Sequence, residues 1–221
     1  MSSHIQRILV WPGKLRLAHG LIAFGTLGLI ATGFLIRHAP SVAEAASRYH
    51  GMLAALLTAG LLIRIWLLFT DETTANWQAL SPNRIQTSAL LDMLRFYLSF
   101  GRSPLPAWYA HNPLWIPLYG ITLLLLTILI LTGYLMPSQP LLFTRIYLPD
   151  LHRATANLIL IFTAAHIVAS ILHDLKGSGS DLSGIVNGHR IFLIEKKPAQ
   201  PISTVKFFTP DKISDTKPPA D

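Results

Sequence analysis

Four long apolar stretches dominate the pattern of hydrophobic and polar positions along the chain. They are rich in Leu, Ile and Ala, and breaks that contain proline separate them. The stretches are Leu17–Ile36, His50–Phe69, Ile116–Met136 and Leu151–His173. A helix that crosses a bilayer needs roughly 20 mostly apolar residues, and a buried strand is much shorter. The pattern therefore predicts an all-α integral membrane protein, a bundle of four transmembrane helices.

Two segments outside these stretches have patterns of their own. Between the second and third stretches, residues 84–100 carry apolar positions at helical spacing: Ile85, Leu90, Leu91, Leu94 and Leu98. This spacing predicts an amphipathic helix that lies in the membrane interface. The chain after Ile194 is rich in Pro and Lys and has no apolar period, which is typical of an extended or disordered tail. We therefore expect a membrane domain at 1–195 and a tail at 196–221.

Composition supports the membrane assignment and narrows the chemistry. Of the 221 residues, 51% are hydrophobic and only 13% are charged, about half the charge of a typical soluble domain. The chain has no cysteine, which excludes disulfides, cysteine-ligated iron–sulfur clusters and covalently attached c-type haem. Any redox centre must therefore use other ligands, and nine histidines are available.

The distribution of Lys and Arg predicts the orientation. With the N-terminus in the cytoplasm, three groups that together hold ten Lys and Arg face the cytoplasm, and four, Arg37, Arg48, Arg145 and Arg153, lie on the opposite side. The positive-inside rule then favours both termini in the cytoplasm. The net charge of +7 is a topology signal and an attraction to anionic lipid headgroups of the bilayer. Since no basic run is interleaved with aromatic residues, we expect no nucleic-acid partner.

The histidines inside the apolar stretches form a pattern. His152 and His166 are 14 residues apart in the last stretch, which places them about 40° short of four full turns and about 21 Å apart along the axis. They share one helix face at opposite depths. Chain direction then places His50 level with His152 on the non-cytoplasmic side, and His19 roughly level with His166 nearer the cytoplasm.

Two pairs of histidines, each pair at one depth in the membrane, predict two b-type haems. A low-spin haem iron takes two axial ligands on opposite faces of a flat ring, and imidazole is well suited to this role. In the other interpretation, the histidines only form hydrogen bonds between helices. A second alternative concerns His173, which shares the helix face of His166 and is also near the level of His19. We prefer His166 because His173 would lie at the aqueous edge beside Asp174.

Arginine within or beside a span is a second candidate group. Arg64 lies 14 residues after His50 in the second stretch and should reach the level of the cytoplasmic haem. A buried guanidinium needs an anionic partner, and a haem propionate would serve; in the other interpretation, Arg64 extends to the lipid headgroups. Arg153, like Arg37 and Arg48, could bind a propionate at the other face. Thr32-Gly33 and Thr132-Gly133 could simply permit close approach of the backbones.

At this point the sequence resembles a known family, the bacterial cytochrome b561 and nickel–iron hydrogenase b-type cytochrome superfamily, with formate dehydrogenase gamma subunits as relatives. The matching pieces are Arg16-Leu17-Ala18-His19, Thr32-Gly33, His50-Gly51, Arg64-Ile65-Trp66, His111-Asn112-Pro113-Leu114, the His152–His166 spacing and Asn187-Gly188-His189-Arg190. The resemblance covers residues 12–195. It departs from the hydrogenase type at His189, where Tyr is usual, and in the tail.

The resemblance implies a four-helix diheme b cytochrome of the bacterial inner membrane, with His19 paired to His166 and His50 to His152. It implies a redox partner subunit, an iron–sulfur or cytochrome c protein, at the periplasmic face. It also implies a quinone site near the cytoplasmic haem, where His111 and Asn112 could supply a polar group for each quinone oxygen and a proton source.

The leading hypothesis is an electron-transfer subunit of an oxidoreductase complex that exchanges electrons between the periplasmic partner and the quinone pool. The direction, quinone reduction or quinol oxidation, depends on potentials that the sequence does not display. One alternative is a stand-alone cytochrome b561 that oxidises superoxide or a small reductant, although the long central loop and the tail disfavour the compact form. Another is a haem-free membrane anchor.

Overall fold

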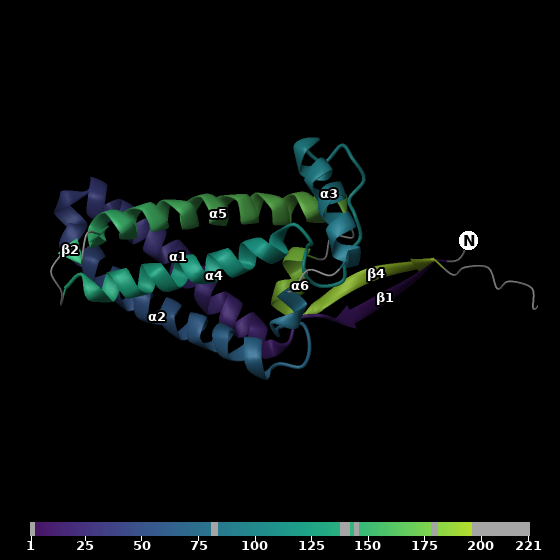
Figure 1. Cartoon of the computed structure of the whole chain (residues 1–221), viewed down its shortest axis with the longest axis horizontal. Helices are drawn as coiled ribbons and strands as arrows, with labels where there is room; N and C mark the ends of the chain where they lie inside the picture. The colour runs from purple at the N-terminus through teal and green to yellow at the C-terminus, as the bar shows by residue number, and fades with distance from the viewer. Residues whose placement is uncertain (1–2, 81–83, 138–141, 144–145, 178–180, 196–221) are drawn as a thin grey trace, which may run out of the picture. The chain divides into compact units, whose positions relative to one another are not determined.

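A computed structural model describes residues 3–80, 84–137, 142–143, 146–177 and 181–195 of the chain (Figure 1). Its main elements are four long apolar helices: α1 (Gly13–His38), α2 (Ala43–Thr70), α4 (Trp115–Leu135) and α5 (Leu148–Lys176). All four are long and apolar enough to cross a membrane. The predicted all-α membrane bundle is therefore confirmed, and each helix includes most or all of its predicted apolar stretch.

Shorter elements connect the long helices. The predicted amphipathic segment contains α3 (Arg84–Leu98). The other short elements are β1 (Ser3–Leu9), η1 (Pro40–Val42), η2 (Gln78–Leu80), β2 (Leu142–Phe143), β3 (Ile146–Tyr147), α6 (Asp181–Asn187) and β4 (His189–Glu195). β1 pairs with β4, and β2 pairs antiparallel with β3. The sequence pattern did not predict these strands or α6. The predicted tail at 196–221 lies outside the described residues.

The described chain divides into two compact units, one of residues 7–191 and one that includes residues 3–6 and 192–195. The first unit holds all the helices. Within it, α1 packs against α2 as a first hairpin, and α4 packs against α5 as a second hairpin. Leu57 and Leu61 of α2 meet Leu126 of α4 and Ile159 of α5 in a buried cluster that joins the hairpins.

Most of the apolar surface of the long helices faces outward. In the most apolar window of each helix, no more than 28% of the residues are buried inside the protein. A protein in water would bury such residues in its core, whereas a bilayer offers them an apolar solvent. The outward apolar surface is therefore the physical basis of membrane insertion for this bundle.

The ends of α5 show how local sequence sets helix limits. Pro149 occupies the first turn, where its missing N–H costs nothing, and Asp150 lies in the same turn, where its charge complements the helix dipole. Lys176 lies in the last turn and Gly177 follows it. These signals hold α5 to 29 residues, long enough to carry His152, His166 and His173, the three histidines of the last apolar stretch.

Gly60 of α2 allows the close crossing of α1 and α2, and its replacement by Ala should weaken that crossing. A Cβ added at Gly60 would lie 2.8 Å from Leu21 Cβ and 3.0 Å from Ile22 N. Since the backbone of α1 must move, we expect Gly60→Ala to lower the free energy of unfolding by about 1–3 kcal/mol. Thermal unfolding in detergent measures this loss. Gly120→Ala on α4 is the matched control, because a Cβ there meets nothing within 4 Å; equal effects of the two changes would contradict the prediction.

Candidate functional site

The four histidines predicted as haem ligands lie in two pairs that each join two helices. The ring centres of His19 in α1 and His166 in α5 are 6.4 Å apart. His50 in α2 and His152 in α5 are close enough for their charges to interact. His19 lies near the start of α1 and His166 in the second half of α5, towards the end of α5 that α6 follows, whereas His152 lies near the start of α5, just after β2 and β3, and His50 in the first half of α2; Figure 1 shows α6 and β2 at opposite ends of the bundle. We call the two pairs the α6-end pair and the β2-end pair.

Each histidine of the β2-end pair is held by a threonine from the preceding long helix. His50 Nδ1 lies 2.8 Å from the Thr32 hydroxyl, and His152 Nδ1 lies 2.8 Å from the Thr132 hydroxyl. The glycine after each threonine lies against the ring, since an added Cβ would be 3.7 Å from His50 Cε1 at Gly33 and 3.4 Å from His152 Cε1 at Gly133. The Thr-Gly dipeptides therefore fix ring orientation as well as helix approach.

The α6-end pair lines a cavity of about 400 Å³, a size typical of ligand pockets and unusual in a packed core. Aromatic residues surround His166. Phe162 stacks on it with ring planes 5° apart, and Trp115 meets its ring edge-on. The cavity is lined by residues of α1, α4 and α5 together with Arg64, His111 and Asn112.

His173, the alternative to His166, is engaged through both ring nitrogens. Its Nε2 lies 2.7 Å from the Tyr97 hydroxyl, and its Nδ1 lies 3.3 Å from Asp181 Oδ2. The Tyr97 oxygen accepts hydrogen bonds from Trp115 Nε1 at 2.7 Å and Asn112 Nδ2 at 3.2 Å. Tyr97 therefore donates its own proton to His173, which in turn donates to Asp181. This network ties α3 and α6 to α5 and leaves neither nitrogen of His173 free for a metal.

Burial shapes the charge state of this network. It raises the pKa of Tyr97 above the usual phenol value, although the hydrogen bonds from Trp115 and Asn112 act in the opposite direction. Tyr97 is thus a neutral hydroxyl at physiological pH. It serves as a donor to His173 rather than as a charged partner.

Arg64 is buried in α2 and is exposed over only 8% of its surface. Its Nη1 donates to the Ala75 carbonyl at 2.7 Å, and its side chain lines the same cavity as His19. Asp71 is its electrostatic partner. Partial burial acts to raise the pKa of Asp71. Hydrogen bonds from Thr73 and Ala75 and the charge of Arg64 outweigh this effect, so the pKa of Asp71 lies below its usual value. Arg64 therefore points into the protein rather than out to the headgroups.

His111 and Asn112, the two residues of the expected quinone site, both line the cavity. The ring of His111 meets Trp11 and Tyr119 edge-on, at centre distances of 5.2 and 5.8 Å. Burial and the nearby Arg64 charge lower the pKa of His111 to about 4, so its imidazole is uncharged at neutral pH. The Asn112 side chain is committed to the Tyr97 hydroxyl and to the Leu114 N–H.

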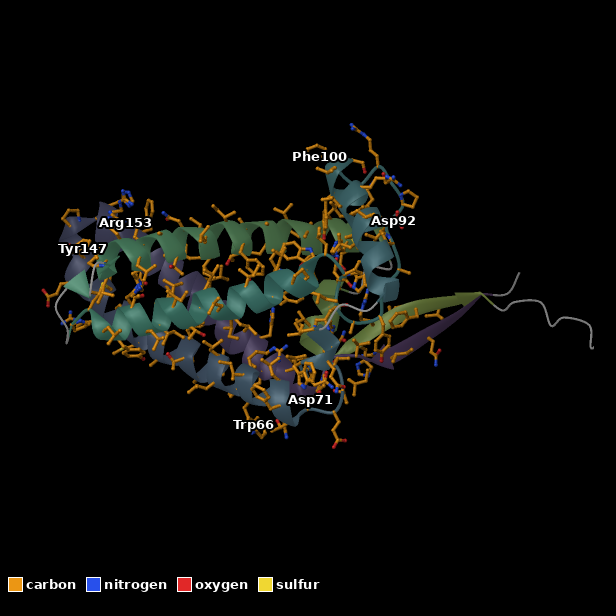
Figure 2. All side chains as sticks on the ribbon, viewed as in Figure 1. Trp66, Asp71, Asp92, Phe100, Tyr147 and Arg153 are labelled. Carbon is orange, nitrogen blue, oxygen red and sulfur yellow. The ribbon has the colours of Figure 1, made fainter. Side chains whose placement is uncertain are left out.

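Arg153 and Arg190 have very different surroundings. Arg153 forms a largely exposed ion pair with Asp150 one turn earlier in α5, at the opposite end of the bundle from Asp71 (Figure 2). Arg190, in the Asn187–Arg190 motif, is buried and pairs with Asp181 at 2.8 Å. Its Nη1 donates to the carbonyls of Trp108 and Tyr109. Gly188 has φ +88°, a left-handed conformation that favours glycine.

Sequence reasoning named Thr32 and Thr132 only as sites of close backbone approach and did not predict their contacts with histidine, and it missed Tyr97 and Asp181. Thr32 and Thr132 carried a usable signal, because each Thr-Gly pair recurs at nearly the same distance before a histidine, 18 residues before His50 and 20 before His152. Tyr97 and Asp181 carried none, since Tyr97 meets His173 across 76 residues of sequence and Asp181 lies in the short helix α6 that follows α5.

The fold and the histidine pairs define a class, a multi-pass membrane protein with paired imidazoles inside its helix bundle. Residues 10–188 match the family model of prokaryotic cytochrome b561, and the chain belongs to this family. The chain is also 25% identical, over 85% of its length and 88% of the relative's, to a probable Ni/Fe-hydrogenase B-type cytochrome subunit of Cupriavidus necator. No solved structure matches the chain. The protein is thus a multi-pass b-type cytochrome of bacterial electron transport.

The α6-end histidine pair fits the b-type haem that this family implies. A metal–imidazole bond is about 2 Å long, so a metal held between two imidazoles needs ring centres about 6 Å apart; the α6-end pair has 6.4 Å. Among the described residues, no group of three or more His, Cys, Asp or Glu could hold a metal ion. Two-histidine ligation of a haem iron agrees with this donor set, because the macrocycle supplies the other ligands.

Proposed function

We propose that the chain is a diheme b-type cytochrome subunit that passes electrons between a periplasmic redox partner and the quinone pool of the bacterial inner membrane. The observation that carries the proposal is the pair of imidazoles at each end of one bundle. His19 and His166 would hold one haem, and His50 and His152 the other. When bound, each haem supplies one-electron chemistry by alternating between ferric and ferrous iron.

The positive-inside rule orients the bundle. It places the α6 end and both termini in the cytoplasm and the β2 end at the periplasm. The periplasmic partner would then meet the loops before α2 and α5. A hydrogenase-type subunit is one candidate for that partner, since the relative in C. necator is described as a hydrogenase cytochrome subunit.

The cavity at the α6 end is the proposed quinone site. His111 is uncharged there and half-buried, so it can hydrogen-bond a quinone oxygen without the cost of burying a charge. Arg64 lines the same cavity and is available to an anionic group such as a haem propionate. Arg153 and Asn112 remain predicted cofactor-binding residues, each with a present partner that it would share or exchange.

Haem content tests the proposal directly. The purified protein should hold two b-type haems per chain in a reduced-minus-oxidised pyridine haemochrome spectrum. His50→Ala and His152→Ala should each remove the same haem, because either change takes one of its two axial ligands. His38→Ala, an exposed position on α1, is the control and should retain both haems.

Two outcomes would contradict the proposal. A protein with no b-type haem would be a membrane anchor. If His50→Ala instead removed the haem that is lost in His166→Ala, the pairing by depth would be wrong. Proteins that co-purify in mild detergent would then identify the redox partner of a protein that passes both tests.

A further inference from the structure

We propose that Thr32 and Thr132 are positioning residues that strengthen His50 and His152 as electron donors to iron, and so hold the reduction potential of the β2-end haem below that of the α6-end haem. The inference rests on the proposed function, which places a haem between His50 and His152. It adds the direction in which electrons run downhill, from the β2 end to the α6 end.

The hydroxyl proton of each threonine goes to a carbonyl of the threonine's own helix. Thr32 Oγ1 lies 2.8 Å from the Gly28 carbonyl, and Thr132 Oγ1 lies 2.7 Å from the Ile128 carbonyl. A hydroxyl has one proton and two lone pairs. When each threonine donates to its own helix, it retains a lone pair to accept Nδ1–H from the histidine at 2.8 Å. The proton then lies on Nδ1, and Nε2 keeps the lone pair that a metal requires.

This hydrogen bond would lower the reduction potential of the iron. An acceptor at Nδ1–H raises the basicity of an imidazole ligand. A more basic ligand favours ferric over ferrous iron and lowers the reduction potential. Since both axial histidines of the site have such an acceptor, the two effects act in the same direction.

The surroundings of the α6-end pair differ from those of the β2-end pair. Within the described part of the chain, no side-chain hydrogen bond is found to the ring of His19 or His166; His166 instead contacts the rings of Phe162 and Trp115. Arg64 lines the cavity of this pair, and a nearby positive charge favours the less positive, reduced state of iron. At the β2 end, the ion pairs of Arg48 and Arg153 are more than half exposed, whereas Arg64 is only 8% exposed, so solvent screens the charges at the β2 end more strongly.

The same contact of a Thr-Gly dipeptide with a histidine occurs in both hairpins. In the first hairpin α1 supplies Thr32-Gly33 to His50 of α2, and in the second α4 supplies Thr132-Gly133 to His152 of α5. The same dipeptide therefore holds the two opposed imidazoles from separate helices. Chance packing would have to produce this arrangement independently on each side of the site.

Redox titration of the purified, haem-loaded protein tests the inference. Thr32→Val and Thr132→Val keep the shape of the side chain and remove the hydroxyl acceptor, while His152 keeps its hydrogen bond to the Leu129 backbone. Each should reduce the ferric-over-ferrous preference of the β2-end haem about threefold to tenfold, which raises its potential by roughly 30 to 59 mV. The α6-end haem should not shift. Thr32→Ser and Thr132→Ser restore a hydroxyl and should return the potential towards that of the unmodified protein.

Thr127→Val is the matched control, because Thr127 is also on α4 and its described side-chain hydrogen bond goes only to the Leu123 carbonyl of its own helix. An unchanged β2-end potential in both valine variants, or an equal shift in Thr127→Val, would overturn the inference. A β2-end haem with the higher potential in the unmodified protein would overturn the direction. Loss of haem in a valine variant with recovery in the serine variant supports the positioning role. Failure of the proposed function is separate, since it appears as missing haem in the unmodified protein.

Discussion

His166→Ala should reduce the haem content from two per chain to one, whereas His173→Gln should retain both. The ring centres of His19 and His166 are separated by the distance that two imidazoles on one iron require. His173 is seven residues further along α5 but is held between Tyr97 and Asp181. To ligate iron through Nε2, it would have to give up the hydrogen bond from Tyr97, and the Tyr97 hydroxyl would lose its acceptor inside the protein, which is costly.

Glutamine at position 173 keeps a hydrogen-bonding side chain of similar size and so separates ligation from folding. The haemochrome spectrum and the melting temperature are measured on the same preparations. His19→Ala should lose the same haem as His166→Ala. If His173→Gln lost a haem while His166→Ala retained both, the axial ligand would be His173 and the α6-end pair would need reassignment.

Arg190→Ala should destabilise the bundle more than any surface substitution. Arg190 is 7% exposed, pairs with Asp181, donates to two carbonyls and lies over the ring of Trp108 at 5.0 Å. Burial lowers the pKa of Arg190, but Asp181 and Asp174 oppose this effect, and the guanidinium stays charged at neutral pH. Removing one partner of a buried ion pair costs about 3–5 kcal/mol.

For a chain of this size that loss corresponds to roughly 6 to 20 °C in melting temperature, measured by thermal unfolding in detergent. Arg190→Lys keeps the charge but not the planar fork that spans the carboxylate and two carbonyls. The melting temperature of Arg190→Lys should therefore fall between those of the unmodified protein and Arg190→Ala. Arg95→Ala is the matched control, because its ion pair with Asp92 is exposed and worth about 0–1 kcal/mol. Equal melting temperatures for Arg190→Ala and Arg95→Ala would show that the buried pair contributes little.

The long helices were predictable because the bilayer imposes one simple demand on them. A run of about 20 apolar residues has few alternatives to a spanning helix, so the pattern located α1, α2, α4 and α5. The depth of His50, His152 and His166 followed from helix rise alone. Pairing them needed only the alternation of chain direction from one span to the next.

The surroundings of the α6-end cavity were not predictable in the same way. Arg190 reaches Trp108 and Tyr109 across some 80 residues of sequence, and Asp181 meets His173 through a helix of only seven residues. No periodicity encodes such contacts, because they depend on how irregular loops close. Thr32 and Thr132 are intermediate: their spacing from histidine was visible, but only the structure shows hydroxyl and imidazole within hydrogen-bond distance.

The division of the bundle into two hairpins has a consequence for its assembly in the cell. Each hairpin closes through contacts that are local in sequence, whereas each proposed axial pair joins residues more than a hundred positions apart, one from the first hairpin and one from α5. Two haems would therefore act as long-range cross-links, and a ligand that binds only the assembled form shifts the equilibrium towards it. Haem supply would then set how much of the newly inserted chain assembles and escapes proteolysis.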